Sequence, residues 1–295
     1  MNSILVATDF SERSDRALRR ATMLAKQTGA TIALVHVIDD DQPYWIIETE
    51  RKASARLLGE QATTLRDMDG VTCEAHVVVA APFAGIVKAT QTTAADLLVV
   101  GPHRRQVLLD VFIGTTAERT IRSVDCPVLM VNAPPVGAYQ QMLLTTDLSP
   151  ASGSAISTFA SLGIAGRADL ALLYVFHDPA LGLSRAHTML KDDENPAYRK
   201  ALDTARRDLA GFVAALDRKP DVPMRQILRH ENTRPAHEIQ NAAREAAADL
   251  IVIGTQGRSG LRRLVLGSVA EEVLRDGRQD VLVIPPGALR RSETA

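Results

Sequence analysis

Short, nearly unbroken apolar runs recur along the chain and alternate with segments whose apolar residues follow a helical period. The runs are rich in Val, Ile and Leu, as expected of parallel strands that are covered on both faces. We expect strands at 4–8, 31–37, 74–79, 97–100 and 128–131, and again at 142–146, 170–176, 225–228, 250–253 and 281–284.

The segments between these runs read as helices. Apolar residues at helical spacing fill the stretch between Ser11, a good N-cap, and Gly29, a typical C-terminal stop. A second apolar stripe runs from Tyr198 to Leu216. Alternating strands and helices joined by right-handed crossovers predict a doubly wound α/β fold.

The sequence contains two similar units in tandem. The segment 4–11, Ile-Leu-Val-Ala-Thr-Asp-Phe-Ser, matches 142–149, Met-Leu-Leu-Thr-Thr-Asp-Leu-Ser. The segment 95–101, Ala-Asp-Leu-Leu-Val-Val-Gly, matches 248–254, Ala-Asp-Leu-Ile-Val-Ile-Gly. Because each unit has the length of an ordinary domain, we predict a tandem duplication. A Pro- and Gly-containing join leads to predicted domains at 1–134 and 139–287.

The most informative motif follows the fourth strand of the second half. That strand ends at Gly254, Gly257 comes three residues later, and nine residues separate it from Gly267. Ser268 then opens a helical pattern as the expected N-cap, with Glu271 placed to complete a capping box. Free N–H groups at a helix start attract anions, and glycines let backbone come close to a ligand. The motif therefore predicts a phosphate cradle.

This spacing is neither the Rossmann fingerprint nor the P-loop. With a strand before it and a helix after it, the motif resembles the ATP-binding signature of the universal stress protein family. The resemblance covers essentially the whole chain, each half looking like one family domain. It implies two tandem doubly wound five-stranded parallel-sheet domains of strand order 3-2-1-4-5, a Rossmann-like fold of the adenine nucleotide alpha hydrolase type.

Carried over by position, the resemblance implies an ATP site in the second half, with or without Mg²⁺. It places Asp147 at the ribose and Val175 at the adenine through its backbone. Arg258 adds positive charge near the loop, either as a phosphate contact or as part of a solvated basic face. The implied site consists of Thr145, Thr146, Asp147, Val175, Ile253, Gly254, Gly257, Arg258, Gly267, Ser268 and Val269.

Residue chemistry supports the same orientation of the nucleotide. A carboxylate is a good acceptor for ribose hydroxyls and a poor neighbour for phosphates, so Asp147 marks the sugar end and the glycine loop the phosphate end. In a doubly wound sheet, ligands bind beyond the carboxyl ends of the strands, at the switch point of strand order. Asp147 and Gly254 each follow such a strand end and are expected to face one another.

The first half departs from the motif. Arg104 stands where the second half has its middle glycine, and Pro102 removes one N–H donor. A guanidinium can instead bind phosphate with two hydrogen bonds, so Arg104 could replace backbone donors. We favour a weakened or empty first site, whose remaining residues are Asp9, Val37, Gly101, Arg104, Gly114 and Thr115.

Composition excludes several classes of function. The net charge of -1 leaves no electrostatic footprint for nucleic acid or an anionic membrane surface. Two cysteines cannot form a disulfide framework, and no apolar run approaches the length of a membrane span. The N-terminus runs straight into a strand pattern without an export signal. We expect a cytoplasmic protein.

Several polar residues have a structural explanation. His36 lies in a strand and is expected to be a satisfied core residue, whereas His230 and His237 are expected on a surface loop. Asp96 and Asp249 open matching strands and are expected to orient local backbone. The histidines show no spacing typical of a metal site.

We find no nucleophile motif, no P-loop lysine and no evident general base. The leading hypothesis is therefore a cytoplasmic, ATP-binding regulatory protein whose halves pack as an internal pseudo-dimer, with association into a homodimer left open. Its protein partners are unidentified. Trp45 is expected between the second strand and the second helix, either in an exposed surface that contacts a partner or packed under the connecting loop. The alternatives are a slow adenine-nucleotide hydrolase and a nucleotide-free interaction scaffold.

Overall fold

The computed structural model describes residues 1–102, 115–178, 195–256, 266–286 and 288. Its ten strands form one sheet in the order β3-β2-β1-β4-β5-β10-β9-β6-β7-β8, so each half has the predicted order 3-2-1-4-5. The strands are β1 Ser3–Ala7, β2 Thr31–Ile38, β3 Cys73–Val79, β4 Leu97–Val100, β5 Val128–Met130, β6 Gln141–Thr146, β7 Asp169–Phe176, β8 Met224–His230, β9 Leu250–Gly254 and β10 Asp280–Ile284. The doubly wound α/β fold is confirmed.

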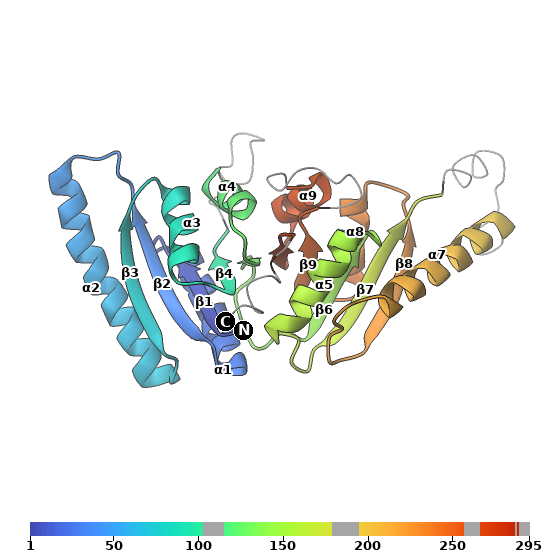
Figure 1. The fold of residues 1–295 in the computed structure, drawn as a ribbon, viewed down its shortest axis with the longest axis horizontal. Coiled ribbons are helices and arrows are strands. Elements are labelled where there is room, and N and C mark those ends of the chain that lie inside the picture. The colour runs from blue at the N-terminus through green and yellow to red at the C-terminus, as the bar shows by residue number, and fades with distance from the viewer. Residues whose placement is uncertain (103–114, 179–194, 257–265, 287, 289–295) are drawn as a thin grey trace.

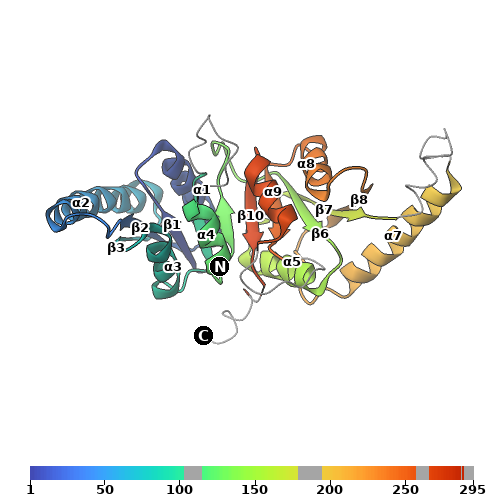
Figure 2. The ribbon, with the colours of Figure 1, turned by 90° about the horizontal axis from the view of Figure 1, so that it is seen from above.

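Helices cover both faces of the sheet, as Figures 1 and 2 show. One core layer contains residues of α1 (Glu12–Thr28), α2 (Tyr44–Asp69), α5 (Pro150–Leu162) and α7 (Pro196–Ala214). The other contains residues of α3 (Pro82–Thr92), α4 (Thr115–Ser123), α8 (Pro235–Glu245) and α9 (Ser268–Asp276). Because both faces are covered, the central strands are almost entirely buried, which explains their unbroken apolar runs.

Strand pairing is parallel within each half and antiparallel where the halves meet. At that join, Leu282 of β10 lies opposite Leu129 of β5. Two five-stranded sheets thus become one continuous ten-stranded sheet within a single chain. This pairing provides hydrogen-bond partners for backbone N–H and C=O groups of β5 and β10, which would otherwise be exposed edge strands.

The local predictions at α1 are confirmed. The Ser11 side chain accepts a hydrogen bond from the backbone N–H of Ser14, and Gly29 ends the helix with φ of 76°. The prediction for β8 was too short because Arg229 and His230 interrupt the apolar run but still pair with β7. Trp45 lies in the first turn of α2, not in a connection, and its side chain is exposed.

A buried polar group, here called the junction cluster, links the two halves. It consists of Arg20 of α1, Tyr139 of the connection between the halves, and Asp280 of β10. The Asp280 carboxylate lies 3.3 Å from Arg20 Nε and accepts a hydrogen bond of 2.7 Å from the Tyr139 hydroxyl. The Arg20 guanidinium lies 3.9 Å from the centre of the Tyr139 ring. Burial raises the pKa of Asp280, although Tyr139 and Arg20 oppose that effect.

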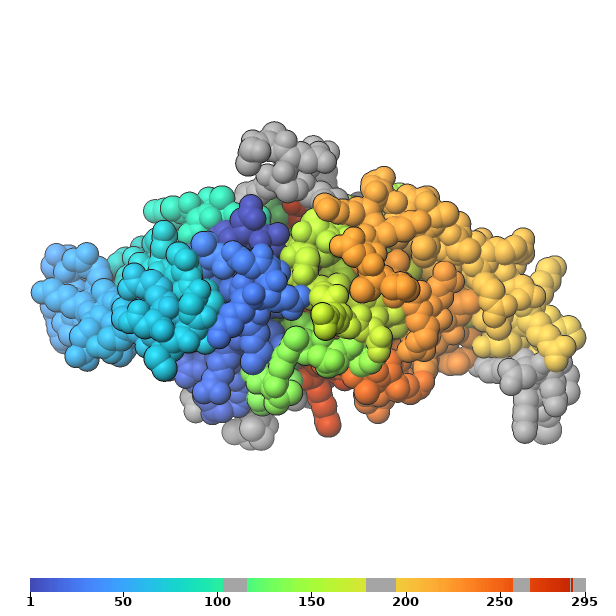
Figure 3. Space-filling model, turned by 90° about the horizontal axis from the view of Figure 1, so that it is seen from below, coloured from blue at the N-terminus to red at the C-terminus, as the bar shows by residue number. Residues whose placement is uncertain are grey.

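Further contacts join the halves outside the sheet. The side-chain amide of Gln27 in α1 donates to the carbonyl of Ile164, 3.1 Å away, just after α5. Figure 3 shows the surface of the first half, in blue and cyan, meeting that of the second half, in green and orange. Within the described residues, no helix has the length and apolar character needed to cross a membrane.

Candidate functional site

The turn from β6 into α5 presents Asp147. Leu148 takes the left-handed conformation, with φ of 64°, and so turns the chain sharply. One carboxylate oxygen of Asp147 accepts hydrogen bonds from the backbone N–H of Ser149, at 3.0 Å, and from its hydroxyl, at 2.6 Å. The Ser149 side chain in turn caps α5 by accepting from the N–H of Ser152. The carboxylate is therefore held in one orientation.

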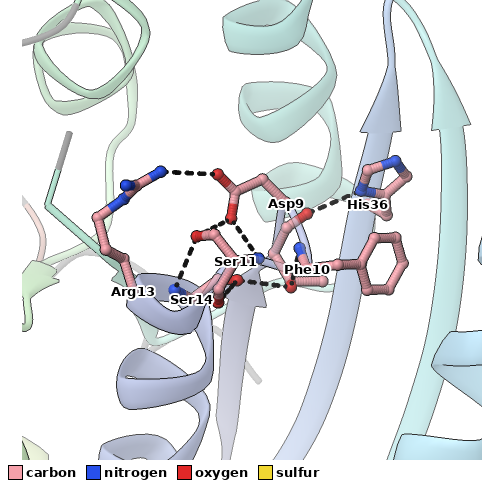
Figure 4. Close-up of polar contacts among 7 residues, drawn as sticks. Asp9, Phe10, Ser11, Arg13, Ser14 and His36 are labelled. Carbon is pink, nitrogen blue, oxygen red and sulfur yellow. Dashed lines mark hydrogen bonds and ion pairs between the residues drawn. The ribbon is translucent and has the colours of Figure 1, made fainter. Parts of the chain in front are cut away.

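The first half builds the same turn (Figure 4). Phe10 has φ of 59°, and Asp9 accepts from the N–H and the hydroxyl of Ser11 at 3.0 and 2.5 Å. Burial raises the pKa of Asp9, but the hydrogen bonds from Ser11 and the nearby Arg13 outweigh it and bring that pKa below its ordinary value. Arg13 lies 3.5 Å from Asp9, whereas the second half has Ala151 at this position.

The second-half site lies at the switch point of strand order. β6 pairs with β7 on one side and with β9 on the other. Asp147 follows β6 and Gly254 ends β9, so both lie where the carboxyl ends of these neighbouring strands share one edge. The start of α9 is close by, because the N–H of Gly267 donates to the carbonyl of Thr255 at 2.8 Å. This is where a doubly wound sheet binds its ligands.

Other predicted residues of this site have structural roles. The Thr145 hydroxyl donates to the carbonyl of Val252 at 3.0 Å, and the Thr146 hydroxyl bonds to that of Ser152 at 2.8 Å. Val175 in β7 is half-buried and Ile253 in β9 is buried. Gly257 and Arg258 lie outside the described residues, so their predicted roles stay predictions.

The start of α9 differs from expectation. Gly267, in an extended conformation, is the N-cap, and Ser268 is the first helical residue, so the predicted Ser268 cap and its capping box are wrong. The N–H of Gly267 donates to the Thr255 carbonyl and so holds Gly267 in the extended chain. The helix therefore begins one residue earlier than predicted. Among the described residues, no side chain caps this helix start, and Val269 lies in its first turn. Such an uncapped first turn leaves backbone N–H groups for an anion.

The first half contains a cavity of about 310 Å³ among the described residues. Asp9, Val37 and Gly101 of the predicted first site line it. A Cβ added at Gly101 would lie 2.7 Å from the Arg13 carbonyl oxygen, so only glycine lets the chain after β4 pass this close to α1. Thr115 begins α4, while Arg104 and Gly114 lie outside the described residues.

Side chains that the sequence motifs did not single out also line this cavity. They come from α1, β2 and α4 and are Arg13, His36, Thr116 and Thr120. A position-by-position comparison of the two halves signals three of them, because the second half has Ala151, Val269 and Val273 at the places of Arg13, Thr116 and Thr120. These replacements give the first cavity a polar lining of its own.

The helices α4 and α9 contact each other across the join. The Arg122 guanidinium of α4 pairs with Glu118 in its own helix and lies 3.5 Å from the Glu271 carboxylate in the first turn of α9. Glu271 is thus oriented toward the other half instead of back toward its own helix start. The last turn of α4 and the first turn of α9 are thus in contact across the join.

Of the remaining polar residues, the two aspartates have the predicted role and His230 does not. The Asp96 carboxylate accepts from the N–H of Ser3 at 3.1 Å, and that of Asp249 accepts from the N–H of Gln140 at 2.7 Å, which confirms their backbone role. The surface-loop prediction is wrong for His230, which ends β8 and is buried against Phe176.

His237 also departs from the loop prediction, because it lies in α8, with its ring 3.5 Å from Glu272. His36 is half-buried, and its Nδ1 lies 2.8 Å from the carbonyl oxygen of Thr8. No group of three or more His, Cys, Asp or Glu residues able to hold a metal ion occurs in the described part of the chain.

Comparison with known proteins agrees with this architecture. The model of the universal stress protein family matches residues 1–132 and 138–285. A universal stress protein of Mycolicibacterium smegmatis is 28% identical over 304 aligned residues, which cover 96% of this chain and 97% of the relative. Universal stress protein Rv2005c of Mycobacterium tuberculosis is 24% identical, with 96% of each chain covered.

A solved structure shows the same fold. The crystal structure of a universal stress protein from Archaeoglobus fulgidus superposes with a TM-score of 0.71 at 19% identity, covering 97% of this chain and 99% of its own. Because the family model matches both halves, which together form nearly the whole chain, the chain belongs to the universal stress protein family as a two-domain member.

Proposed function

We propose that the protein is an ATP-binding regulatory module that holds ATP mainly in its second half. The observation that carries this proposal is the uncapped start of α9 beside the end of β9, at the switch point of the sheet. Backbone N–H groups and the helix dipole favour phosphate there. Gly257 and Arg258, by the family resemblance, would complete the phosphate end.

The proposed sugar end of the site rests on Asp147. Asp147 offers carboxylate oxygens that accept hydrogen bonds from hydroxyl groups, and Ser149 fixes its orientation. A Cβ added at Gly254 would make ordinary van der Waals contacts with Ala155 Cβ and the Gln256 carbonyl oxygen, each at 3.6 Å. Val175, half-buried near the end of β7, would offer its backbone to the adenine.

The proposed role is binding, not rapid catalysis. The sequence has no P-loop lysine, and among the described residues the site offers no general base beyond the ribose-side carboxylate of Asp147. ATP at the start of α9 would instead act on the contact between Glu271 and Arg122, and so on the first half. The surface offered to protein partners would then depend on the nucleotide. The same proposal places the protein in the cytoplasm, where ATP is available.

The first test is to purify the protein and identify the small molecules released on unfolding. An equimolar amount of ATP supports the proposal. ADP that accumulates with time would favour the slow hydrolase, and a nucleotide-free protein that also fails to bind added ATP would favour the interaction scaffold.

A second test is Gly257→Arg, which copies the first half. The added side chain should occupy the space that backbone and phosphate share, so we expect loss of ATP retention with an unchanged melting temperature. Gly211→Arg is the matched control, because it adds the same side chain at an exposed site on α7 with no atom within 4 Å of the added Cβ. Unchanged ATP affinity in Gly257→Arg would show that the cradle is misassigned.

A further inference from the structure

The outer strand of the first half, β3, has a free edge. β3 ends the sheet and, among the described residues, pairs only with β2. The carbonyl of Thr72 accepts from β2, and the N–H of Ala80 donates to the carbonyl of Ile38 in β2. Backbone groups alternate in direction along a strand, so the residues between these two positions that turn their N–H and C=O groups outward are Cys73, Ala75, Val77 and Val79.

The two outer edges of the sheet differ in protection. β8, at the other end, carries Arg225 and Arg229, and charged side chains on an edge strand oppose its pairing with a further strand. At the corresponding positions β3 has Glu74 and Val78. β3 contains no lysine, arginine or proline and ends in three valines. It is therefore the edge that stays open to a further strand.

The polar residues of β3 complement a second copy of the same strand. Glu74 and His76 lie on one face of β3, 3.5 Å apart, with side chains that are 74% and 39% exposed. The Nε2 of His76 makes no hydrogen bond within the described residues. In an antiparallel pair with Ala75 opposite Ala75 of the second copy, Glu74 of each strand lies opposite His76 of the other. These positions are not joined by backbone hydrogen bonds, so their side chains come closest.

The helix beside this edge adds exposed apolar side chains. α2 packs against β3 at the same end of the sheet (Figures 1 and 2). Leu57 and Met68 of α2 are exposed, and their separation, from position 57 to position 68, is close to three helical turns, which places them on one face. Val79 at the end of β3 is exposed as well. Apolar side chains left exposed beside a free edge favour contact with another chain.

We propose that two copies of this chain associate through their β3 edges, as an antiparallel strand pair about a two-fold axis at Ala75. The partner is a second copy because the charges of β3 are complementary to themselves, whereas those of β8 are two arginines. The same surface is used on both copies, so the association closes at the dimer. This surface is separate from the ATP site proposed for the second half and goes beyond that function.

The test is sedimentation velocity of the whole protein over a range of concentrations. Ala75→Pro removes an outward N–H at the axis, and proline is accepted on an edge strand where its nitrogen faces away from the sheet. Gln226→Pro is the matched control. Gln226 is the equivalent residue of β8, and because the N–H of Glu231 donates to Phe176 in β7, the same alternation turns Gln226 outward.

A second pair of variants tests the charges. Glu74→Lys places a lysine opposite His76 of the other copy, and the double variant Glu74→Lys/His76→Glu restores opposite charges across the axis. Arg225→Glu is the control, because it reverses a charge at the position of β8 that corresponds to Glu74. Melting temperatures establish that each variant folds, and the charge variants decide alone if Ala75→Pro does not fold.

We expect the wild-type protein, Gln226→Pro and Arg225→Glu to form dimers with equal dissociation constants. Ala75→Pro should raise that constant at least tenfold, since the two hydrogen bonds at the axis are lost. Glu74→Lys should also raise it, and the double variant should recover most of the affinity. The proposal is overturned if the wild-type protein stays monomeric, if it grows into open-ended oligomers, or if Ala75→Pro and Glu74→Lys dimerise unchanged. Absence of ATP binding would remove the function proposed for the second half and leave this interface standing.

Discussion

At the scale of single residues, the carboxylates of Asp9 and Asp147 make equivalent hydrogen bonds in the two halves. In both halves one oxygen accepts two hydrogen bonds from the serine two positions later. This contact fixes the turn and at the same time holds the carboxylate in one orientation. The difference between the halves lies beside this carboxylate, where Arg13 stands in one and Ala151 in the other.

The first prediction concerns Asp147→Ala. If Asp147 binds the ribose, ATP affinity should fall by about 1–3 kcal/mol, as expected for losing a hydrogen bond to a charged group. Isothermal titration measures the change. Asp9→Ala is the control, because it disturbs the same turn in the other half and should leave ATP affinity as it is. A dissociation constant that Asp147→Ala does not alter would remove this residue from the site.

The second prediction concerns Cys73, the first residue of β3. Burial raises the pKa of its thiol to about 11, with a smaller opposing effect of Arg66. Because the thiolate is the reactive form, the folded protein should resist alkylation by iodoacetamide near pH 8, and the unfolded protein should react readily. Mass spectrometry of a Cys126→Ser variant isolates this thiol. Rapid labelling under native conditions would contradict the buried position of Cys73.

At the scale of elements, the helix starts differ in whether a side chain caps them. α1 and α5 start with Ser11 and Ser149, whose side chains accept backbone hydrogen bonds. α9 starts with Gly267 and has no such side chain in the described part of the structure. The starts of α2, α3 and α8 also lack a side-chain cap, so what distinguishes α9 is its place beside the end of β9, where the proposed function puts the phosphates.

The third prediction compares two caps. Ser149→Ala and Ser11→Ala should each lower the free energy of unfolding by about 1 kcal/mol, since each removes an N-cap. Only Ser149→Ala should also weaken ATP binding, because it releases Asp147 from its fixed orientation. Urea denaturation and ATP titration of both variants give the two quantities. Equal effects of the two variants on ATP affinity would contradict a site confined to the second half.

At the scale of the whole molecule, a continuous sheet and the buried junction cluster join the two halves. Arg20 and Asp280 have side chains that are 6% and 1% exposed, so their ion pair is shielded from solvent. Asp280 also accepts from the backbone N–H groups of Asn132 and Ala133, at 2.9 and 3.0 Å. The connection between the halves is thereby fixed to β10.

The fourth prediction concerns Arg20→Met. Removing the cation leaves the buried Asp280 charge without its partner, and loss of one partner of a buried pair costs about 3–5 kcal/mol. Arg56→Met is the control, because the Arg56–Glu60 pair lies on the surface and should contribute about 0–1 kcal/mol. Chemical denaturation measures both. A loss in Arg20→Met no larger than in Arg56→Met would show that the pair does not stabilise the join.

The effect of Arg20→Met should depend on pH. Burial raises the folded-state pKa of Asp280 above its ordinary value, so this group stabilises the fold most at low pH, and its contribution falls as pH rises through the folded pKa. Without Arg20 that pKa rises further. The stability difference between the variant and the wild-type protein should therefore be smaller at about pH 4 than at about pH 7.

Much of this protein follows from its sequence. The apolar runs and the serine and glycine at the ends of α1 are local signals, and they produced the predicted strands and helix. The duplication is equally visible, because the two halves keep matching residues at matching positions. Periodicity and capping depend on near neighbours in the chain, which a sequence displays directly.

Tertiary structure decided what depends on distant neighbours. The pairing of β5 with β10, the burial of Arg20 against Asp280, and the start of α9 at Gly267 all rest on atoms brought together by folding. The open edge of β3 is visible only once the order of the strands is known. Sequence by itself determined which elements form and that they form twice; only the folded chain decided which polar groups meet, because hydrogen bonds and ion pairs require contact in space.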